Sequence, residues 1–173
     1  MAATIPFNGL TNFTTLMGET WRLTSSLAVT STTSSILTSN WERADTRGYP
    51  ASATPLGTGM SESSGVFTFP ATGIYLVLLE GYFAYSNSTT SNYSGVSVHV
   101  TTNNSDYANT NRGYCGLTSN SAYESTHLSS IIDVTDTANV KIKIGYEIHA
   151  SGTVGGNTND NDTAVTFIRL GDT

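Results

Sequence analysis

The chain has 173 residues, of which only 12% are charged, and its 13 acidic and 7 basic residues give a net charge of −6. This balance excludes the basic surface that nucleic-acid binding needs, and no apolar run is long enough for membrane insertion. A composition rich in Ser, Thr, Gly and Asn, with 10% aromatic residues, indicates one antiparallel β domain rather than a disordered chain.

The first segment, residues 1–20, carries apolar side chains without a regular period and is predicted to be an extended N-terminal arm, followed by a domain over residues 21–173. It lacks the features of a signal peptide, which predicts synthesis in the cytoplasm. Exposed apolar side chains need a partner groove. The candidates for anchoring the domain to a larger particle are Ile5, Phe7, Phe13 and Leu16. The competing interpretation is that the arm packs on its own assembly as an extra strand.

The strongest strand prediction follows a turn at Ala71–Gly73. Residues 74–85 form the most apolar run, and side chains on both faces of this strand are apolar. A two-layer sandwich covers one of those faces, so a second subunit is expected to cover the other. The candidate oligomer interface on this strand consists of Tyr75, Val77, Leu79, Phe83 and Tyr85. The alternation alone does not decide which face meets the partner.

Later segments alternate apolar and polar residues with a period of two. Residues 95–100 and 140–149 are predicted to be strands with one face on the core and one face in water. Further strands are expected at 128–134 and 164–170, and the Gly/Asn/Asp-rich residues 151–163 are predicted to form a loop.

The stretch from Gly65 to Val77, GVFTFPATGIYLV, carries the pattern Gly-x-Phe-x-x-Pro-x-x-Gly-x-Tyr. The pattern is filled by Gly65, Phe67, Pro70, Gly73 and Tyr75. It resembles the signature of tumour-necrosis-factor-like jelly rolls, and most of all the globular heads of complement first-component proteins and their phage and bacterial relatives. The resemblance implies an all-β, antiparallel jelly-roll β-sandwich, a homotrimer, and a binding or structural role rather than catalysis.

The Ser/Thr/Asn-rich composition and the closing RLGDT are similar to virion proteins of tailed phages. The expected function is therefore that of a non-enzymatic virion structural protein, a trimeric capsid decoration or head-fibre module located on the virion and fixed by its arm. The alternative is a receptor- or glycan-binding head of a phage fibre. Its possible recognition surface consists of Tyr107, Tyr114 and Tyr123, because tyrosines among small polar residues make adaptable contacts.

No catalytic or metal-binding motif is complete in the sequence. There is no Gly-x-Ser-x-Gly elbow, and His99, His127 and His149 lie far apart in the sequence, so neither a catalytic residue nor a zinc site is predicted. No cofactor is expected either. Residues 157–162 alternate oxygen-bearing side chains and leave calcium binding open, although they supply only two carboxylates. The single cysteine, Cys115, excludes an intrachain disulfide.

Overall fold

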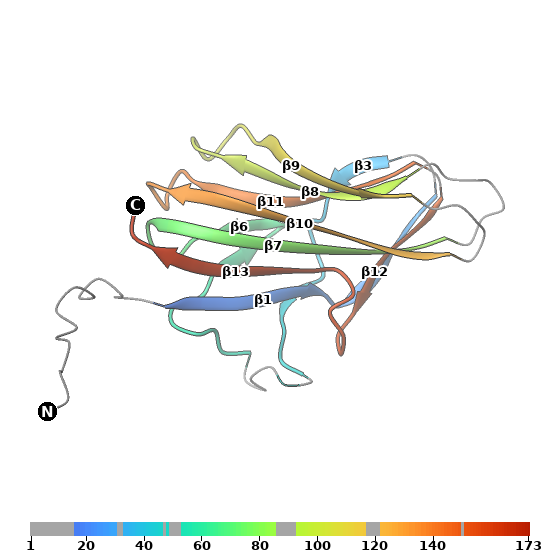
Figure 1. The fold of residues 1–173 in the computed structure, drawn as a ribbon, viewed down its shortest axis with the longest axis horizontal. Helices are drawn as coiled ribbons and strands as arrows, with labels where there is room; N and C mark the ends of the chain where they lie inside the picture. Colours follow the sequence, from blue (N-terminus) through green and yellow to red (C-terminus); the bar gives the residue numbers. More distant parts are fainter. Residues whose placement is uncertain are drawn as a thin grey trace, which may run out of the picture.

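The computed structural model describes residues 16–30, 33–46, 48, 53–85, 93–116, 122–149 and 151–173. Within this part of the chain there are thirteen β-strands and no helix. The strands form two antiparallel sheets that pack face to face as a sandwich, and most of the strands run across the picture in Figure 1. None of the described segments is a helix that could cross a membrane.

Sheet A has the strand order β2-β12-β7-β13-β1-β4, and β10 pairs with the other side of β7. Its strands are β1 (Met17–Leu23), β2 (Ser25–Val29), β4 (Trp41–Arg43), β7 (Gly73–Ala84), β10 (Tyr123–Val134), β12 (Gly152–Asn157) and β13 (Ala164–Gly171). The pairing of β7 with β10 runs over twelve residues of each strand, which makes β7 the central strand of this sheet.

Sheet B has the strand order β5-β6-β11-β8-β9, and β3 pairs with the end of β11. Its strands are β3 (Thr33–Ile36), β5 (Ser61–Ser63), β6 (Val66–Thr68), β8 (Ser94–Thr101), β9 (Ala108–Cys115) and β11 (Lys141–Ile148). In both β8 and β11 the even-numbered apolar residues point toward sheet A, as their alternation predicts.

The core between the sheets is built around Phe67, which is fully buried. Its ring centroid lies 5.6 Å from that of Trp21, 5.3 Å from Trp41 and 5.4 Å from Phe167, the first two in edge-to-face geometry. Tyr75 is also buried and donates a hydrogen bond from its hydroxyl to the carbonyl of Ala71 at 2.9 Å. The two aromatic residues of the signature therefore fill the sandwich.

The two glycines of the signature occupy backbone positions that a side chain would obstruct. Gly65 has φ = 79°, and a Cβ there would lie 2.5 Å from the carbonyl oxygen of Leu37. Gly73 has φ = 143°, and its Cβ would lie 2.5 Å from the carbonyl oxygen of Gly171. Both positions combine a positive φ with close backbone contact, which is why glycine stands there.

Three strands correct the sequence-based assignment. Residues 17–20, assigned to the arm, are the first part of β1, which lies inside sheet A and pairs with β13. β12 falls within residues 151–163, which were expected to form a loop, and β9 has no counterpart among the expected strands. Tyr114 lies in β9, and Tyr123 begins β10. The strands expected at 74–85, 95–100, 128–134, 140–149 and 164–170 are all confirmed, although β10 begins earlier than expected, at Tyr123.

Candidate functional site

The two faces of β7 have different environments. The side chains proposed for the oligomer interface point into the sandwich and are 0–4% exposed: Tyr75, Val77, Leu79, Phe83 and Tyr85. That assignment is corrected, because these residues form the core of a single subunit and are not accessible to a second copy. Any partner of β7 must therefore contact the opposite face, which carries Leu76 and Leu78.

The outer face of sheet A carries an apolar row, defined here as Ile131, Leu76 and Ile168, which are in register across β10, β7 and β13. Ile131 is 71% exposed, and the neighbouring Leu78 on β7 is 40% exposed. The row continues to Gly18 on β1, which forms an isolated bridge with the exposed Leu56. Apolar side chains from three adjacent strands, β10, β7 and β13, thus form one band across the solvent side of this sheet, and Leu56 lies beyond β1.

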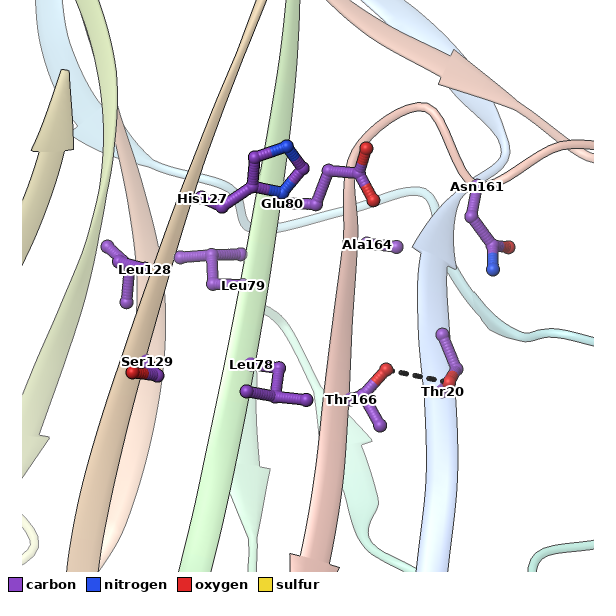
Figure 2. A pocket seen from close by; sticks show the side chains of 10 residues that line it. All are labelled: Thr20, Leu78, Leu79, Glu80, His127, Leu128, Ser129, Asn161, Ala164 and Thr166. Carbon is purple, nitrogen blue, oxygen red and sulfur yellow. Dashed lines mark hydrogen bonds between the residues drawn. The ribbon is translucent and has the colours of Figure 1, made fainter.

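Beside the apolar row lies a shallow depression of about 510 Å³, whose lining includes both leucines and polar side chains (Figure 2). Glu80 and His127 are cross-strand neighbours there, and the hydroxyls of Thr20 and Thr166 are hydrogen bonded at 2.8 Å. Among the described residues, no hydrogen bond joins His127 to Glu80 or to Ser129. The depression thus lacks the linked nucleophile, base and acid that nucleophilic catalysis requires.

The three tyrosines proposed as one recognition surface lie in three separate places. Tyr107 precedes β9 and Tyr114 lies near its other end, both on the outer side of sheet B. Tyr123 is on the outer face of sheet A, where its ring stacks on Tyr82 with a centroid distance of 5.9 Å and an interplanar angle of 9°. The structure does not bring these three side chains together.

Tyr114 belongs to an aromatic cluster that the sequence did not indicate. Its hydroxyl donates to Glu147 Oε2 at 3.0 Å, and Tyr93 donates to Oε1 of the same carboxylate at 2.9 Å. The two tyrosine rings meet edge to face at 5.3 Å, and His149 stacks on Tyr93 at 5.0 Å. The hydrogen bond to Glu147 is the main cause that raises the pKa of Tyr93. The cluster links the end of β11 to β9 across Gly95 of β8.

Of the proposed anchoring residues, Leu16 is described and is exposed just before β1. Ile5, Phe7 and Phe13 lie outside the described residues. Because β1 begins at Met17, the boundary between arm and domain falls before this residue rather than after residue 20.

The Asn/Asp-rich segment at 157–162 covers a buried charge. Thr158 donates to Glu42, and the backbone carbonyl of Asn159 accepts a hydrogen bond from Thr46. Both of these partners also contact Arg22, which is 1% exposed and additionally pairs with Asp45 at 2.6 Å. The Asn157 side chain accepts from the Asn159 amide and donates to Asp160 within the loop. In the part of the chain that the structure describes, no cluster of three His, Cys, Asp or Glu residues could hold a metal ion.

Cys115 and His99 occupy half-buried positions on sheet B. Burial is the main cause that raises the pKa of the Cys115 thiol, which also contacts the carbonyl of Ser94 at 3.6 Å. Burial lowers the pKa of His99, and the positive charges of Arg112 and Lys143 lower it further. A high thiol pKa reduces the thiolate fraction, so Cys115 is not an activated nucleophile.

Comparison with solved structures identifies the fold class. The structure is similar to Eiger TNF from S. frugiperda, with a TM-score of 0.66 and 10% sequence identity over 92% of this chain and 95% of that chain. It is also similar to murine APRIL at pH 5.0, with a TM-score of 0.61 and 13% identity over 90% of this chain and 99% of that chain. A second murine APRIL structure, at pH 8.5, has a TM-score of 0.58 and 14% sequence identity to this chain. The TNF-like jelly roll implied by the sequence signature is therefore confirmed as the fold.

The sequence itself matches no known family model and no curated protein. At identities of 10–14%, the structural similarity extends to the fold alone.

Proposed function

We propose that the chain associates as a homotrimer through the outer face of sheet A and serves as a non-catalytic structural module. The observation that carries this proposal is the apolar row of Ile131, Leu76 and Ile168, with Leu78 beside it, on the solvent side of the sheet. Soluble monomers seldom expose a continuous apolar band, because water is displaced from it readily by another surface. Closed threefold symmetry follows from the resemblance to trimeric jelly rolls.

Sedimentation of the Ile131→Asp variant tests this association. We expect the wild-type chain to sediment as a trimer at micromolar concentration and Ile131→Asp to sediment as a folded monomer, because three carboxylates would have to be desolvated in the assembly. Ser63→Asp is the matched control: it adds the same charge to an exposed position on sheet B and leaves the trimer intact. A monomeric wild type, or a trimeric Ile131→Asp, contradicts the proposal.

The same proposal places the trimer on a virus particle, as a capsid decoration or a head-fibre module made in the host cytoplasm. Its support is the similarity in composition and closing sequence to virion proteins of tailed phages. Attachment through Ile5, Phe7, Phe13 and Leu16 is part of the proposal, and Leu16 is solvent-exposed where β1 begins. Copurification of the native protein with intact particles tests this location.

The alternative, a receptor- or glycan-binding head, loses its original support because Tyr123 lies on sheet A, whereas Tyr107 and Tyr114 lie at opposite ends of β9 on sheet B. A binding function on this fold needs a site of different composition.

A further inference from the structure

The only two lysines of the chain, Lys141 and Lys143, lie on the outer face of sheet B. They are two residues apart on β11, so their side chains leave the same face about 6.6 Å apart at the backbone. Lys141 is in register with Thr68 on β6, which pairs with Ser61 on β5. Lys143 is in register with Val66 and, on the other side, with His99. The pairing of four strands thus places two ammonium groups beside a row of hydroxyls.

These side chains line a pocket of about 480 Å³, which we call the lysine pocket. Its lining includes Ser61, Ser63, Thr68, Tyr107, Lys141 and Lys143. The volume lies within the range of small-ligand sites, which runs from about 300 to 1,000 Å³. Unlike most such sites, the lysine pocket is lined mainly by hydroxyl and ammonium groups, which suits a ligand that is itself polar.

The two lysines differ from the structural arginines in having no acidic partner. Arg22, Arg43 and Arg169 each form an ion pair with a carboxylate. Among the described residues, neither Lys141 nor Lys143 does so, although the net charge of the whole chain is −6. Two cations without a partner acid in one pocket attract an oxyanion.

Two neighbouring contacts fix the groups that line the lysine pocket. Lys143 Nζ lies 3.9 Å from the ring centroid of Tyr107, which fixes the ammonium in place. Glu62, the acidic residue of the lining, accepts a hydrogen bond from the Gly65 amide at 2.6 Å, so one of its oxygens is directed to its own turn.

The wall of the pocket next to β9 is held rigid by Asn103. Its Oδ1 accepts hydrogen bonds from the amides of Ser105 and Asp106 at 2.9 and 2.8 Å, and its Nδ2 donates to the Asp106 carboxylate at 2.8 Å. The amide of Asn104 donates to the carbonyl of Asn139 in the adjacent turn at 3.0 Å. A wall that is ordered before binding reduces the conformational entropy that a ligand must overcome.

We propose that the lysine pocket binds an acidic saccharide, with a carboxylate or sulfate group between Lys141 and Lys143 and ring hydroxyls on Ser61, Ser63 and Thr68. The hydroxyl lining distinguishes a saccharide from a bare inorganic anion, which would leave those groups to water. The pocket lies on sheet B, whereas the proposed association face lies on sheet A. The site is therefore complete in one subunit, and trimer formation would add avidity by presenting three copies.

Titration calorimetry with three hexasaccharides tests the proposal: hexagalacturonate for the carboxylate, a heparin hexasaccharide for the sulfate, and neutral maltohexaose. We expect at least one acidic hexasaccharide to bind and maltohexaose not to bind. Lys141→Gln and Lys143→Gln should each weaken the affinity at least about tenfold, since hydrogen bonds to charged groups are strong. Tyr107→Ala should weaken it and Tyr107→Phe should preserve it, because the ring rather than the hydroxyl holds Lys143.

Arg112→Gln is the matched control, because it removes one positive charge from the same sheet without altering the pocket lining. If Arg112→Gln and Lys143→Gln lose affinity equally, the chain attracts polyanions only diffusely, and the proposal is wrong. The proposal is also wrong if neither acidic hexasaccharide binds at millimolar concentration. Sedimentation of the same samples tests the saccharide site separately from trimer formation. If the chain is monomeric and still binds an acidic hexasaccharide, the proposed trimer is wrong but the proposed saccharide site stands.

Discussion

His99, a half-buried residue of sheet B, makes the stability of the fold depend on pH, because burial and two nearby positive charges lower its pKa. Its ring nitrogen Nε2 lies 3.0 Å from Ser97 Oγ, and the ring lies over Gly145, where a Cβ would approach Nε2 to 2.7 Å. The charged groups that act on it are Arg112 and Lys143, and both disfavour the imidazolium form. Protonation of His99 therefore costs more in the folded state than in the unfolded chain.

The resulting prediction concerns stability against pH. Because the folded-state pKa of His99 is lowered, the unfolded chain takes up a proton first as pH falls through about 6.5, so the free energy of unfolding decreases below that pH. We expect His99→Gln to lose less stability than wild type between pH 7 and pH 5. Urea unfolding of both proteins measures the difference, in which the contributions of the other titrating groups cancel. Parallel pH profiles of the two proteins would show that His99 is not the cause.

At the scale of the strand, β7 carries two apolar faces with different partners. Val77 is fully buried between the sheets, whereas its neighbour Leu78 lies on the outer face of sheet A. On this outer face Leu76 lies between Ile131 and Ile168, whereas Leu78 lies between the polar residues Ser129 and Thr166.

Substituting these adjacent residues separates folding from association. Val77→Asp buries a carboxylate without a partner, and we expect it to lower the free energy of unfolding by several kcal/mol or to prevent folding. Leu78→Asp places the same charge one residue along, and we expect a folded subunit whose association is weakened. Circular dichroism with thermal unfolding reports folding, and sedimentation reports association. If both variants unfold, Leu78 belongs to the core of the subunit and the outer face has been assigned wrongly.

The strands that could be predicted from the sequence are those with one apolar and one polar face. Apolar and polar residues alternate regularly in β8 and β11, so the period of two was sufficient to predict both strands. β9, with the sequence ANTNRGYC, is an edge strand whose side chains are mostly polar on both faces, so only its pairing with β8 defines it. In β12 the ring of Tyr82 occupies the space over Gly155, where a Cβ would lie 2.2 Å from Cδ1, and a Cβ on Gly156 would lie 2.4 Å from the carbonyl oxygen of Ser25.

β1 was assigned to the arm for a different reason. Its inner face contains Glu19, a buried acid that pairs with Arg43 at 2.7 Å, between the apolar Met17 and Trp21. An acid at an inward position breaks the apolar alternation that predicts a strand. The sequence alone does not reveal which basic residue pairs with this acid, so it did not predict β1. Arg43 comes from β4, whose register with β1 is a tertiary feature.

The candidate site followed from the sequence only in part. Alternation identified two apolar faces of the strand at 74–85 and predicted that one would need a partner, but it could not choose between them. The choice depends on Ile131 and Ile168, which lie about 50 and 90 residues further along and meet Leu76 only through the pairing of β10 and β13. The lysine pocket likewise depends on pairing, because β5 and β6 bring hydroxyls to the two lysines of β11.

For the whole molecule, the position of β1 determines how the arm can be tested. A truncation at Glu19 would remove Met17 and Gly18 from sheet A, so the deletion must end at residue 15. We expect the chain from Leu16 onward to fold and sediment like wild type but to be lost from virus particles. Particle binding equal to that of the full chain would place the anchor elsewhere, and loss of folding would show that the first fifteen residues are part of the domain.

Met17 at the start of β1 pairs with Arg169 near the end of β13. The first and last strands of the described fold therefore begin and end at the same pole of the sandwich, as Figure 1 shows. Residues paired in this way are about 5 Å apart at their Cα atoms. A protein fused after Thr173 would therefore emerge beside the start of β1, close to any surface to which the preceding residues attach the domain. For display on such a surface, a guest sequence belongs at the far pole, where β7 ends and β10 begins.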